Sequence, residues 1–235
     1  MKFLKNHTAY YLLIGLLFFC LFSTFSQNKK VADSLIAIYQ TSDLELNQKR
    51  DLLMDILEAA SNPETRLNYA DQLIKSAVKD SSYLYMYSGF LHKGHGLREQ
   101  GNFSEAMQVY FLSLNLTEKG EIKVGKGIVL TSIADAYSES GNSKNAQNYY
   151  EKGIQVLREL NDSLKLASAL LNAGDAYFYD KKYDEALKNF SESGILFKEL
   201  NYLIGSAYNL GNIGMVYASQ GKHELAKQNM EEAIV

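Results

Sequence analysis

The chain has 235 residues, and its 24 basic and 27 acidic side chains give a formal net charge of −3. This mildly acidic balance argues against a nucleic-acid-binding protein, because phosphate attraction dominates that affinity and needs clustered lysines and arginines. A single cysteine excludes an intrachain disulfide, and a single proline favours long helices over a loop-rich fold.

The first 26 residues differ in composition from the rest of the chain. Lys2 and Lys5 are followed by a mostly apolar stretch, Ala9–Phe22, and then by Thr24 and Ser26, small residues that suit a cleavage point. This order predicts a secretory signal peptide over residues 1–26. We therefore expect an exported protein, either periplasmic or membrane-associated.

An uncleaved membrane anchor is the alternative for this segment, although the apolar stretch is shorter than the roughly 20 residues that a span needs. Cys20 suggests a lipoprotein cysteine, but bulky Phe18 and Phe19 precede it where small residues are expected. The sequence leaves open whether residues 1–26 are cleaved.

Residues 27–80 have the pattern of a helical N-terminal cap. Apolar residues recur at helical spacing in three stretches, at 31–40, 49–61 and 64–78. We expect the last two, joined across Asn62 and Pro63, to form a degenerate helix pair that caps the repeats that follow.

Residues 81–235 repeat with a period of 40 residues and no insertion. Aromatic residues recur in this pattern, which explains much of the total of 17 tyrosines. The columns of the repeat are a small residue at Gly94, Ala134, Gly174 and Gly214; a large residue at Leu97, Tyr137, Tyr177 and Tyr217; an alanine at Ala106, Ala146, Ala186 and Ala226; a second large residue at Tyr110, Tyr150, Phe190 and Met230; and a second small residue at Ser113, Gly153, Ser193 and Ala233.

The spacing within one copy predicts two packed helices. Gly174 and Tyr177 lie three residues apart and share one helix face. Ala186, Phe190 and Ser193 share one face of the next helix. Small residues let the two backbones approach closely, and the large rings fill the space beside that contact.

Turn and cap residues mark the expected helix ends. Gly101, Gly141 and Gly221 fall at the corner within a repeat, where a left-handed residue can end the first helix. The third copy has Lys181 there, and we expect this corner to be built differently, because a left-handed lysine costs about 1–2 kcal/mol. The candidate helix caps are Ser104, Asp162, Asp184 and Asn201.

This order of small residue, aromatic, turn glycine, aromatic, alanine, aromatic and small residue resembles the tetratricopeptide repeat family. The resemblance implies an all-α fold, a right-handed α-solenoid of helix-turn-helix repeats, with four repeats over residues 81–235 and the last one truncated. Two features depart from the family pattern: the period is 40 residues rather than roughly 34, and the closing proline is missing. Six extra residues lengthen each helix by nearly a turn.

A search for catalytic chemistry gives weak candidates only. His92 and His95 share a helix face that a metal ion can reach, but no third ligand lies nearby in the sequence. Asp135 and Asp175 occupy equivalent places in successive repeats, which favours a structural or ligand-contact role over acid–base catalysis. We expect no catalytic residue, cofactor or metal site in this chain, and we expect His223 to pack at a turn.

The remaining candidate is the groove that the resemblance implies on the concave side, lined by the first helix of each repeat. Asparagine side chains there offer both a donor and an acceptor to a peptide backbone. An alternative is that these asparagines only support contacts between repeats. The candidate groove residues are His92, His95, Arg98, Asp135, Asn172, Asp175 and Asn212.

Two functions remain open. One is a stand-alone exported scaffold that binds a peptide or protein partner. The other is the sensory front end of a signalling protein, because the chain resembles the N-terminal part of bacterial repeat proteins with an adenylate/guanylate cyclase, histidine kinase or helix-turn-helix output domain. Because the sequence stops at Val235, inside a second helix, we expect a fragment whose missing C-terminal segment can tether it to a membrane.

Overall fold

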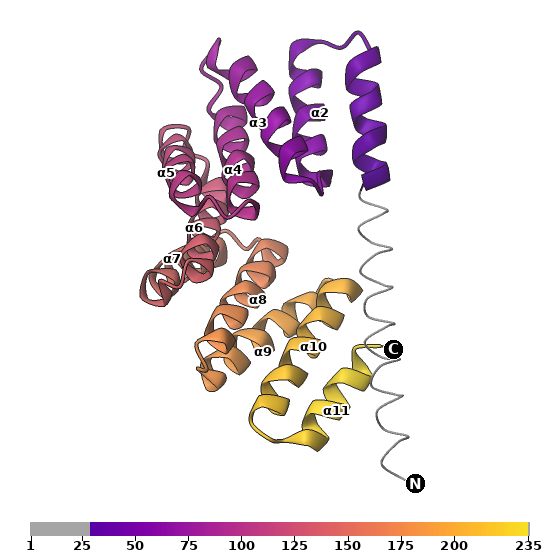
Figure 1. Ribbon diagram of the computed structural model, residues 1–235, viewed down its shortest axis with the longest axis vertical. Helices are drawn as coiled ribbons and strands as arrows, with labels where there is room; N and C mark the ends of the chain where they lie inside the picture. The colour runs from indigo at the N-terminus through magenta and orange to yellow at the C-terminus, as the bar shows by residue number, and fades with distance from the viewer. Residues whose placement is uncertain (1–28, 235) are drawn as a thin grey trace. The chain divides into compact units, whose positions relative to one another are not determined.

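The computed structural model describes residues 29–234, so the predicted signal peptide over residues 1–26 lies outside the described residues. The described part is all-helical and contains no strand, which confirms the expected fold class, an α-solenoid of helix pairs (Figure 1). None of the helices in this part is long and apolar enough to cross a membrane. The helices pack as two compact units, which we call unit 1, up to Gln100, and unit 2, from Gly101 onward.

Unit 1 holds the helices that the sequence pattern predicts before the regular repeats, together with the first helix of the first repeat. Residues 29–41 are helical, and three further helices follow: α2 (Leu46–Ala59), α3 (Pro63–Val78) and α4 (Tyr83–Glu99). The predicted pair across Asn62 and Pro63 is confirmed, since Pro63 begins α3 and the Asn62 side chain caps it by accepting from the backbone N–H groups of Glu64 and Thr65.

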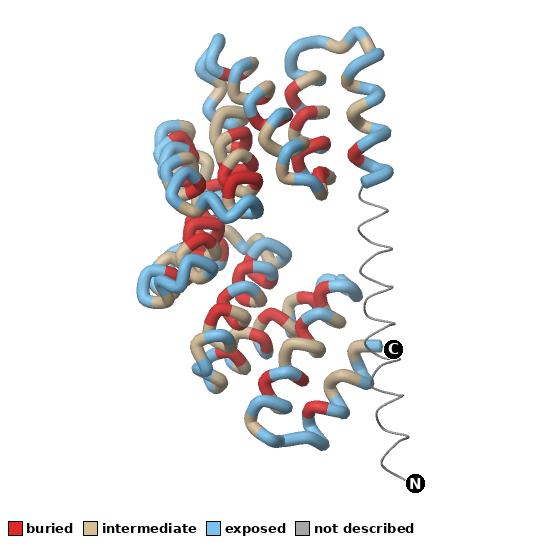
Figure 2. The backbone as a smooth tube through the Cα atoms, in the orientation of Figure 1, coloured by how far each residue is buried: buried red, intermediate tan, exposed pale blue. Residues whose placement is uncertain are grey.

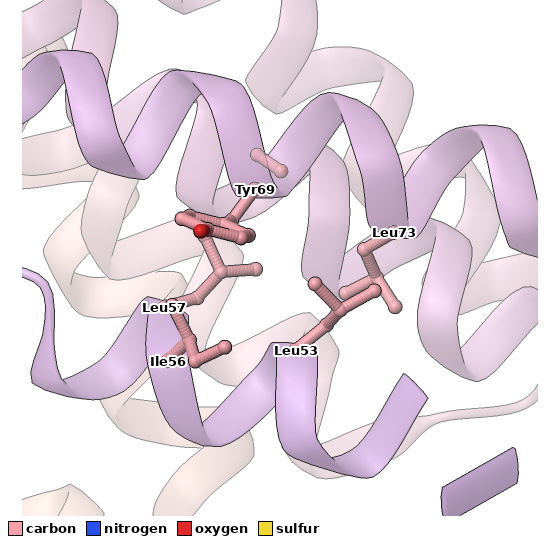
Figure 3. Packing of buried hydrophobic residues seen from close by; sticks show 6 residues of the cluster. Leu53, Ile56, Leu57, Tyr69 and Leu73 are labelled. Carbon is pink, nitrogen blue, oxygen red and sulfur yellow. The ribbon is translucent and has the colours of Figure 1, made fainter. Parts of the chain in front are cut away.

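The core of unit 1 lies between α2 and α3. Leu53 and Leu57 of α2 pack against Tyr69 and Leu73 of α3, and all four are almost fully buried (Figure 3). Tyr39 of the preceding helix meets the Tyr69 ring edge-on, with centroids 6.0 Å apart. Burial of a large apolar side chain contributes about 1.5–3 kcal/mol. This cluster therefore stabilises the pair of α2 and α3, although these two helices lack the residue columns of the regular repeat.

An ion pair that the sequence pattern did not indicate also supports unit 1. The buried guanidinium of Arg50 donates to both carboxylate oxygens of Asp80, at 2.8 and 2.9 Å. The hydrogen bond from Arg50 lowers the pKa of Asp80. Because Asp80 follows α3, this pair fixes α2 against the end of α3.

Unit 2 repeats one helix pair at steps of 40 residues. Its helices alternate between first and second positions of the repeat: α5 (Phe103–Lys119), α6 (Lys123–Glu139), α7 (Ser143–Glu159), α8 (Ser163–Tyr179), α9 (Tyr183–Glu199), α10 (Leu203–Ser219) and α11 (His223–Glu232). The first helices α6, α8 and α10 therefore begin at residues 123, 163 and 203. This equal spacing is the predicted period.

The alanine column lies in the core of unit 2, as the spacing predicts. Ala106, Ala146, Ala186 and Ala226 are at most 5% exposed, although their helices alternate between buried and exposed residues along their length (Figure 2). A Cβ atom on Gly174 would lie 2.5 Å from the Phe190 ring, which leaves room for glycine only. The small-residue columns thus permit the close helix contact.

The corners within each repeat correct one expectation. Gly101, Gly141 and Gly221 have positive φ, as predicted. Lys181 has φ 60°, so the expectation that this corner is built differently is wrong. The corner keeps its shape because the backbone N–H of Lys182 bonds to the carbonyl of Tyr177, as the equivalent groups do in the second and fourth copies.

The helix caps are partly as expected. Asp162 caps α8 by accepting from the backbone N–H of Lys165. Ser104 and Asp184 are not caps, because α5 and α9 begin one residue before them. Asn201 is not a cap either, because it occupies the left-handed corner between repeats with φ 52°. His223 is exposed at the start of α11, so the expectation that it packs is also wrong.

Candidate partner-binding surface

Three of the predicted groove residues lie on α4 of unit 1. His92 is buried, its Nε2 lies 3.7 Å from Oε1 of Glu58 on α2, and its ring meets the edge of the His95 ring at a centroid distance of 5.5 Å. Burial, followed by electrostatic repulsion from His92 and Arg98, lowers the pKa of His95 well below its usual value. The described residues contain no group of three side chains suited to a metal ion.

The other four predicted residues lie together across three helices of unit 2. Asn172 of α8 donates from Nδ2 to Oδ1 of Asp135 on α6 at 3.4 Å. One repeat later, Asn212 of α10 donates from Nδ2 to Oδ1 of Asp175 on α8 at 2.7 Å. The same asparagine–aspartate bridge therefore links successive first helices. This agrees with the alternative prediction from the sequence, in which the asparagines support contacts between repeats.

The two aspartates differ in their surroundings. The hydroxyl of Tyr150 on α7 donates to Oδ1 of Asp135. Asp175 has lost much of its contact with water, and this burial, together with the nearby charge of Asp135, raises its pKa to about 6. Asp175 is therefore a carboxyl group whose charged form is disfavoured in the fold.

Exposed apolar side chains follow the same helix stripe as the bridges. On α10, Ile204 and Tyr208 precede Asn212 by two turns and one turn, and they are 59% and 54% exposed. On α8, Leu164 precedes Asn172 by two turns and is also exposed. A helix places such residues on one face. We call this surface the first-helix face of unit 2; it comprises Val124, Asp135, Leu164, Asn172, Asp175, Ile204, Tyr208 and Asn212.

The row of exposed aliphatic side chains at the start of the first helices was not predicted from the sequence. Val124, Leu164 and Ile204 are 40 residues apart, so the signal was present as a further column of the repeat. Periodicity alone does not separate an exposed aliphatic column from a buried one. The structure shows that the column is exposed. Each of these residues lies in the first turn of its helix, before the residues of the buried columns.

Comparison with known families and structures agrees with this geometry. Tetratricopeptide repeat profiles match residues 165–234 and residues 129–156, so these segments carry tetratricopeptide repeats. Comparison with curated protein sequences gives no significant match.

Several solved structures share the fold at low sequence identity. BtubC (BKLC) from P. vanneervenii is 12% identical with a TM-score of 0.68, and the match covers 91% of this chain and 89% of BtubC. A STAND signal transduction ATPase with a tetratricopeptide repeat sensor, from Pyrococcus horikoshii, is 15% identical with a TM-score of 0.68, covering 88% of this chain and 34% of that one. A Rap protein complexed with competence and sporulation factor is 13% identical with a TM-score of 0.59, covering 90% of this chain and 75% of the Rap protein. The described part of the chain therefore shares the helical-repeat fold of these structures, and residues 129–156 and 165–234 carry tetratricopeptide repeats.

Proposed function

We propose that this chain is a non-enzymatic interaction module that binds an extended segment of a peptide or protein partner on the first-helix face of unit 2. The observation that carries the proposal is the alignment of side-chain amides, carboxylates and exposed aliphatic groups across α6, α8 and α10. An extended backbone presents N–H and C=O groups that these amides and carboxylates can pair, and its side chains can cover the aliphatic row.

The structural neighbours support a peptide as the partner class. One of them is a Rap protein in complex with competence and sporulation factor. The mildly acidic face suits a peptide that is neutral or basic, and the net charge of −3 opposes binding to nucleic acid.

A peptide library displayed on phage, selected against the purified chain, tests this function. Selected peptides are then titrated into the wild-type chain and into Tyr208→Ser and Leu164→Ser variants. We expect at least about a tenfold weaker Kd for these variants, since each loses a large apolar contact. Ile195→Ser is the control, because Ile195 is at least as exposed as Tyr208 and Leu164 but lies on the second helix α9. Peptides whose affinity falls only for the control variant would contradict the proposal.

We further propose that this module is the exported sensory part of a signalling protein. The neighbour with a tetratricopeptide repeat sensor supports this reading, because there a similar fold is part of a larger signal transduction ATPase. In this proposal, enzymatic activity belongs to an output domain beyond Val235, such as an adenylate/guanylate cyclase, and a membrane segment joins the two. A stand-alone periplasmic scaffold without an output domain is the alternative.

Two measurements separate these readings. Reading the gene beyond the codon for Val235 should show an apolar run of about 20 residues and then a catalytic domain; a stop codon within one further helix supports the scaffold. N-terminal sequencing of the protein from its native host should begin near residue 27 if the signal peptide is cleaved. A chain that keeps Met1 in the cytoplasmic fraction would contradict export.

A further inference from the structure

A second surface of unit 2 lies on the side of the second helices, where α7, α8 and α9 line a cavity of about 410 Å³ that is open to solvent on one side. Its apolar wall includes Ile154, Leu170 and Tyr177, and charged side chains form its rim. These residues are not part of the first-helix face. The cavity is therefore a separate feature of the second-helix side.

The preceding repeat shows why this cavity exists. Between α5 and α7 the equivalent space is filled by aromatic rings, because Tyr149 stacks on Tyr137 with centroids 5.5 Å apart and Phe111 meets the edge of Tyr149 at 6.2 Å. Forty residues later, the position of Phe111 is Glu151 and that of Tyr149 is Asn189.

The later repeat keeps the aromatic residue of the cavity wall but lacks the two rings that fill the equivalent space in the preceding repeat. Tyr177, the equivalent of Tyr137, lines the cavity together with Glu151 and Asn189. Lys182 lies over one face of the Tyr177 ring, 5.9 Å from its centroid, but does not line the cavity. The cavity thus occupies the place that the Tyr149 ring fills in the preceding repeat.

The rim has an excess of negative charge. Glu151, Glu185 and Glu192 line the cavity with two cations, Arg158 and Lys188. Arg158 pairs with Glu192, which leaves two carboxylates beside one lysine. Burial, followed by the charges of Glu151 and Glu185, raises the pKa of Tyr177, in agreement with a negative field at this wall.

We propose that the cavity between α7 and α9 is a docking site for an aromatic side chain of a partner polypeptide that carries a basic residue beside the ring. The ring takes the place that Tyr149 occupies in the preceding repeat, next to Tyr177. The basic side chain pairs with Glu151 and Glu185 at the rim. Aromatic pairs and exposed ion pairs each add modestly to affinity, so this site anchors one residue pair of a longer partner.

The probes are N-acetyl-Phe-Lys-amide, N-acetyl-Phe-Glu-amide and N-acetyl-Ala-Lys-amide, titrated into the full chain at millimolar concentration and followed by NMR shifts of backbone amides. We expect shifts around Ile154, Tyr177 and Asn189 with the Phe-Lys probe. The Phe-Glu probe should bind about two- to fivefold more weakly because the charge pairing is lost. The Ala-Lys probe should bind at least about fivefold more weakly because the ring is lost.

Refilling the cavity provides the decisive variant. Glu151→Phe with Asn189→Tyr restores the residues of the preceding repeat and should abolish binding of the Phe-Lys probe. Glu199→Phe is the matched control, since it makes the same exchange at an exposed position of α9 that does not line the cavity. The variant with both Glu151→Gln and Glu185→Gln keeps the cavity and leaves Lys188 as the net charge of the rim, so it should lose the preference for the Phe-Lys probe and bind the Phe-Glu probe at least as tightly.

Equal shifts with all three probes, or undiminished binding to the refilled variant, would overturn the proposal. If the refilled variant does not fold, as judged by helical circular dichroism, the Glu151→Gln, Glu185→Gln variant decides the question through the loss of charge preference. We expect peptide binding at the first-helix face to be unchanged in all these variants. A cavity that does not bind the aromatic probes would therefore not contradict the proposed function, and the two proposals are tested separately.

Discussion

Replacing Asp175 by asparagine should stabilise the protein at neutral pH. The substitution keeps the shape of the side chain and keeps an oxygen that accepts the hydrogen bond from Nδ2 of Asn212. It removes a negative charge that burial and the neighbouring charge of Asp135 disfavour. The wild-type chain therefore contains a charge that opposes folding, and the variant does not.

The pKa of Asp175 gives the size of this effect. Its value rises from 3.8 to about 6 on folding. A shift of one unit corresponds to about 1.4 kcal/mol, so a fully buried carboxyl with this shift would destabilise the fold by about 3 kcal/mol. Because Asp175 keeps part of its contact with water, we reduce the expected gain for Asp175→Asn to about 1–2 kcal/mol.

The sign of the pH dependence follows from the raised pKa. Between pH 3.8 and about 6 the folded chain keeps a proton that the unfolded chain releases, so this group's contribution to stability falls as the pH rises through that window. Below this window Asp175 is protonated in both the folded and the unfolded chain, so it is as neutral as the asparagine. The variant and the wild type should then be equally stable. Above it the advantage of the variant should be constant.

Urea denaturation followed by circular dichroism, at several pH values from about 4 to about 7.5, measures this difference. Asp43→Asn serves as the control, because Asp43 is an exposed carboxyl in the loop before α2 and should give a difference within about 0.5 kcal/mol at every pH. A variant that is less stable than wild type at pH 7, or an advantage that does not change with pH, would show that the charge of Asp175 does not oppose folding.

Three further changes probe the packing of unit 2. Asn212→Ala removes the bridge to Asp175 and should lower the free energy of unfolding by about 1 kcal/mol, measured by urea denaturation; an unchanged value would show that the bridge does not stabilise the repeat contact. Gly174→Leu places a side chain where even a Cβ atom lies 2.5 Å from the Phe190 ring, so we expect a loss of about 3 kcal/mol or more in thermal unfolding, and Gly211→Leu, where a Cβ meets nothing within 4 Å, is the control. Lys181→Gly relieves a left-handed lysine and should raise the stability by about 0.5–1 kcal/mol, after allowance for the greater freedom of glycine in the unfolded chain; a lower melting temperature would contradict this expectation.

The periodic part of the fold was predictable because packing imposes it on the sequence. The four alanines of the column Ala106 to Ala226 are at most 5% exposed, and dense packing at such positions favours a small side chain, so the sequence records the geometry directly. The corner glycines record a left-handed backbone in the same way. Lys181 shows the limit of that inference, since its neighbours in the corner impose the left-handed conformation on a residue that does not favour it.

The surfaces were less predictable than the core. Asn172 and Asn212 were candidates for partner contact, with support of contacts between repeats as the alternative. Their hydrogen bonds to Asp135 and Asp175 show the contact between repeats, and the spacing of the sequence alone did not decide between the two roles. The burial of His92 depends on the packing of α2 and α3, which lie outside the regular repeat. The cavity beside Glu151 results from a departure from the repeat, and a search for regularity overlooks such departures.

NMR mapping of a peptide selected from the displayed library tests whether the first-helix face of unit 2 recognises an extended partner. We expect amide shifts to concentrate on α6, α8 and α10, around Leu164, Asn172 and Tyr208, and nucleotide substrates to remain chemically unchanged in the same sample. Shifts confined to α7, α9 and α11, or turnover of a nucleotide by the purified chain, would contradict the proposed function.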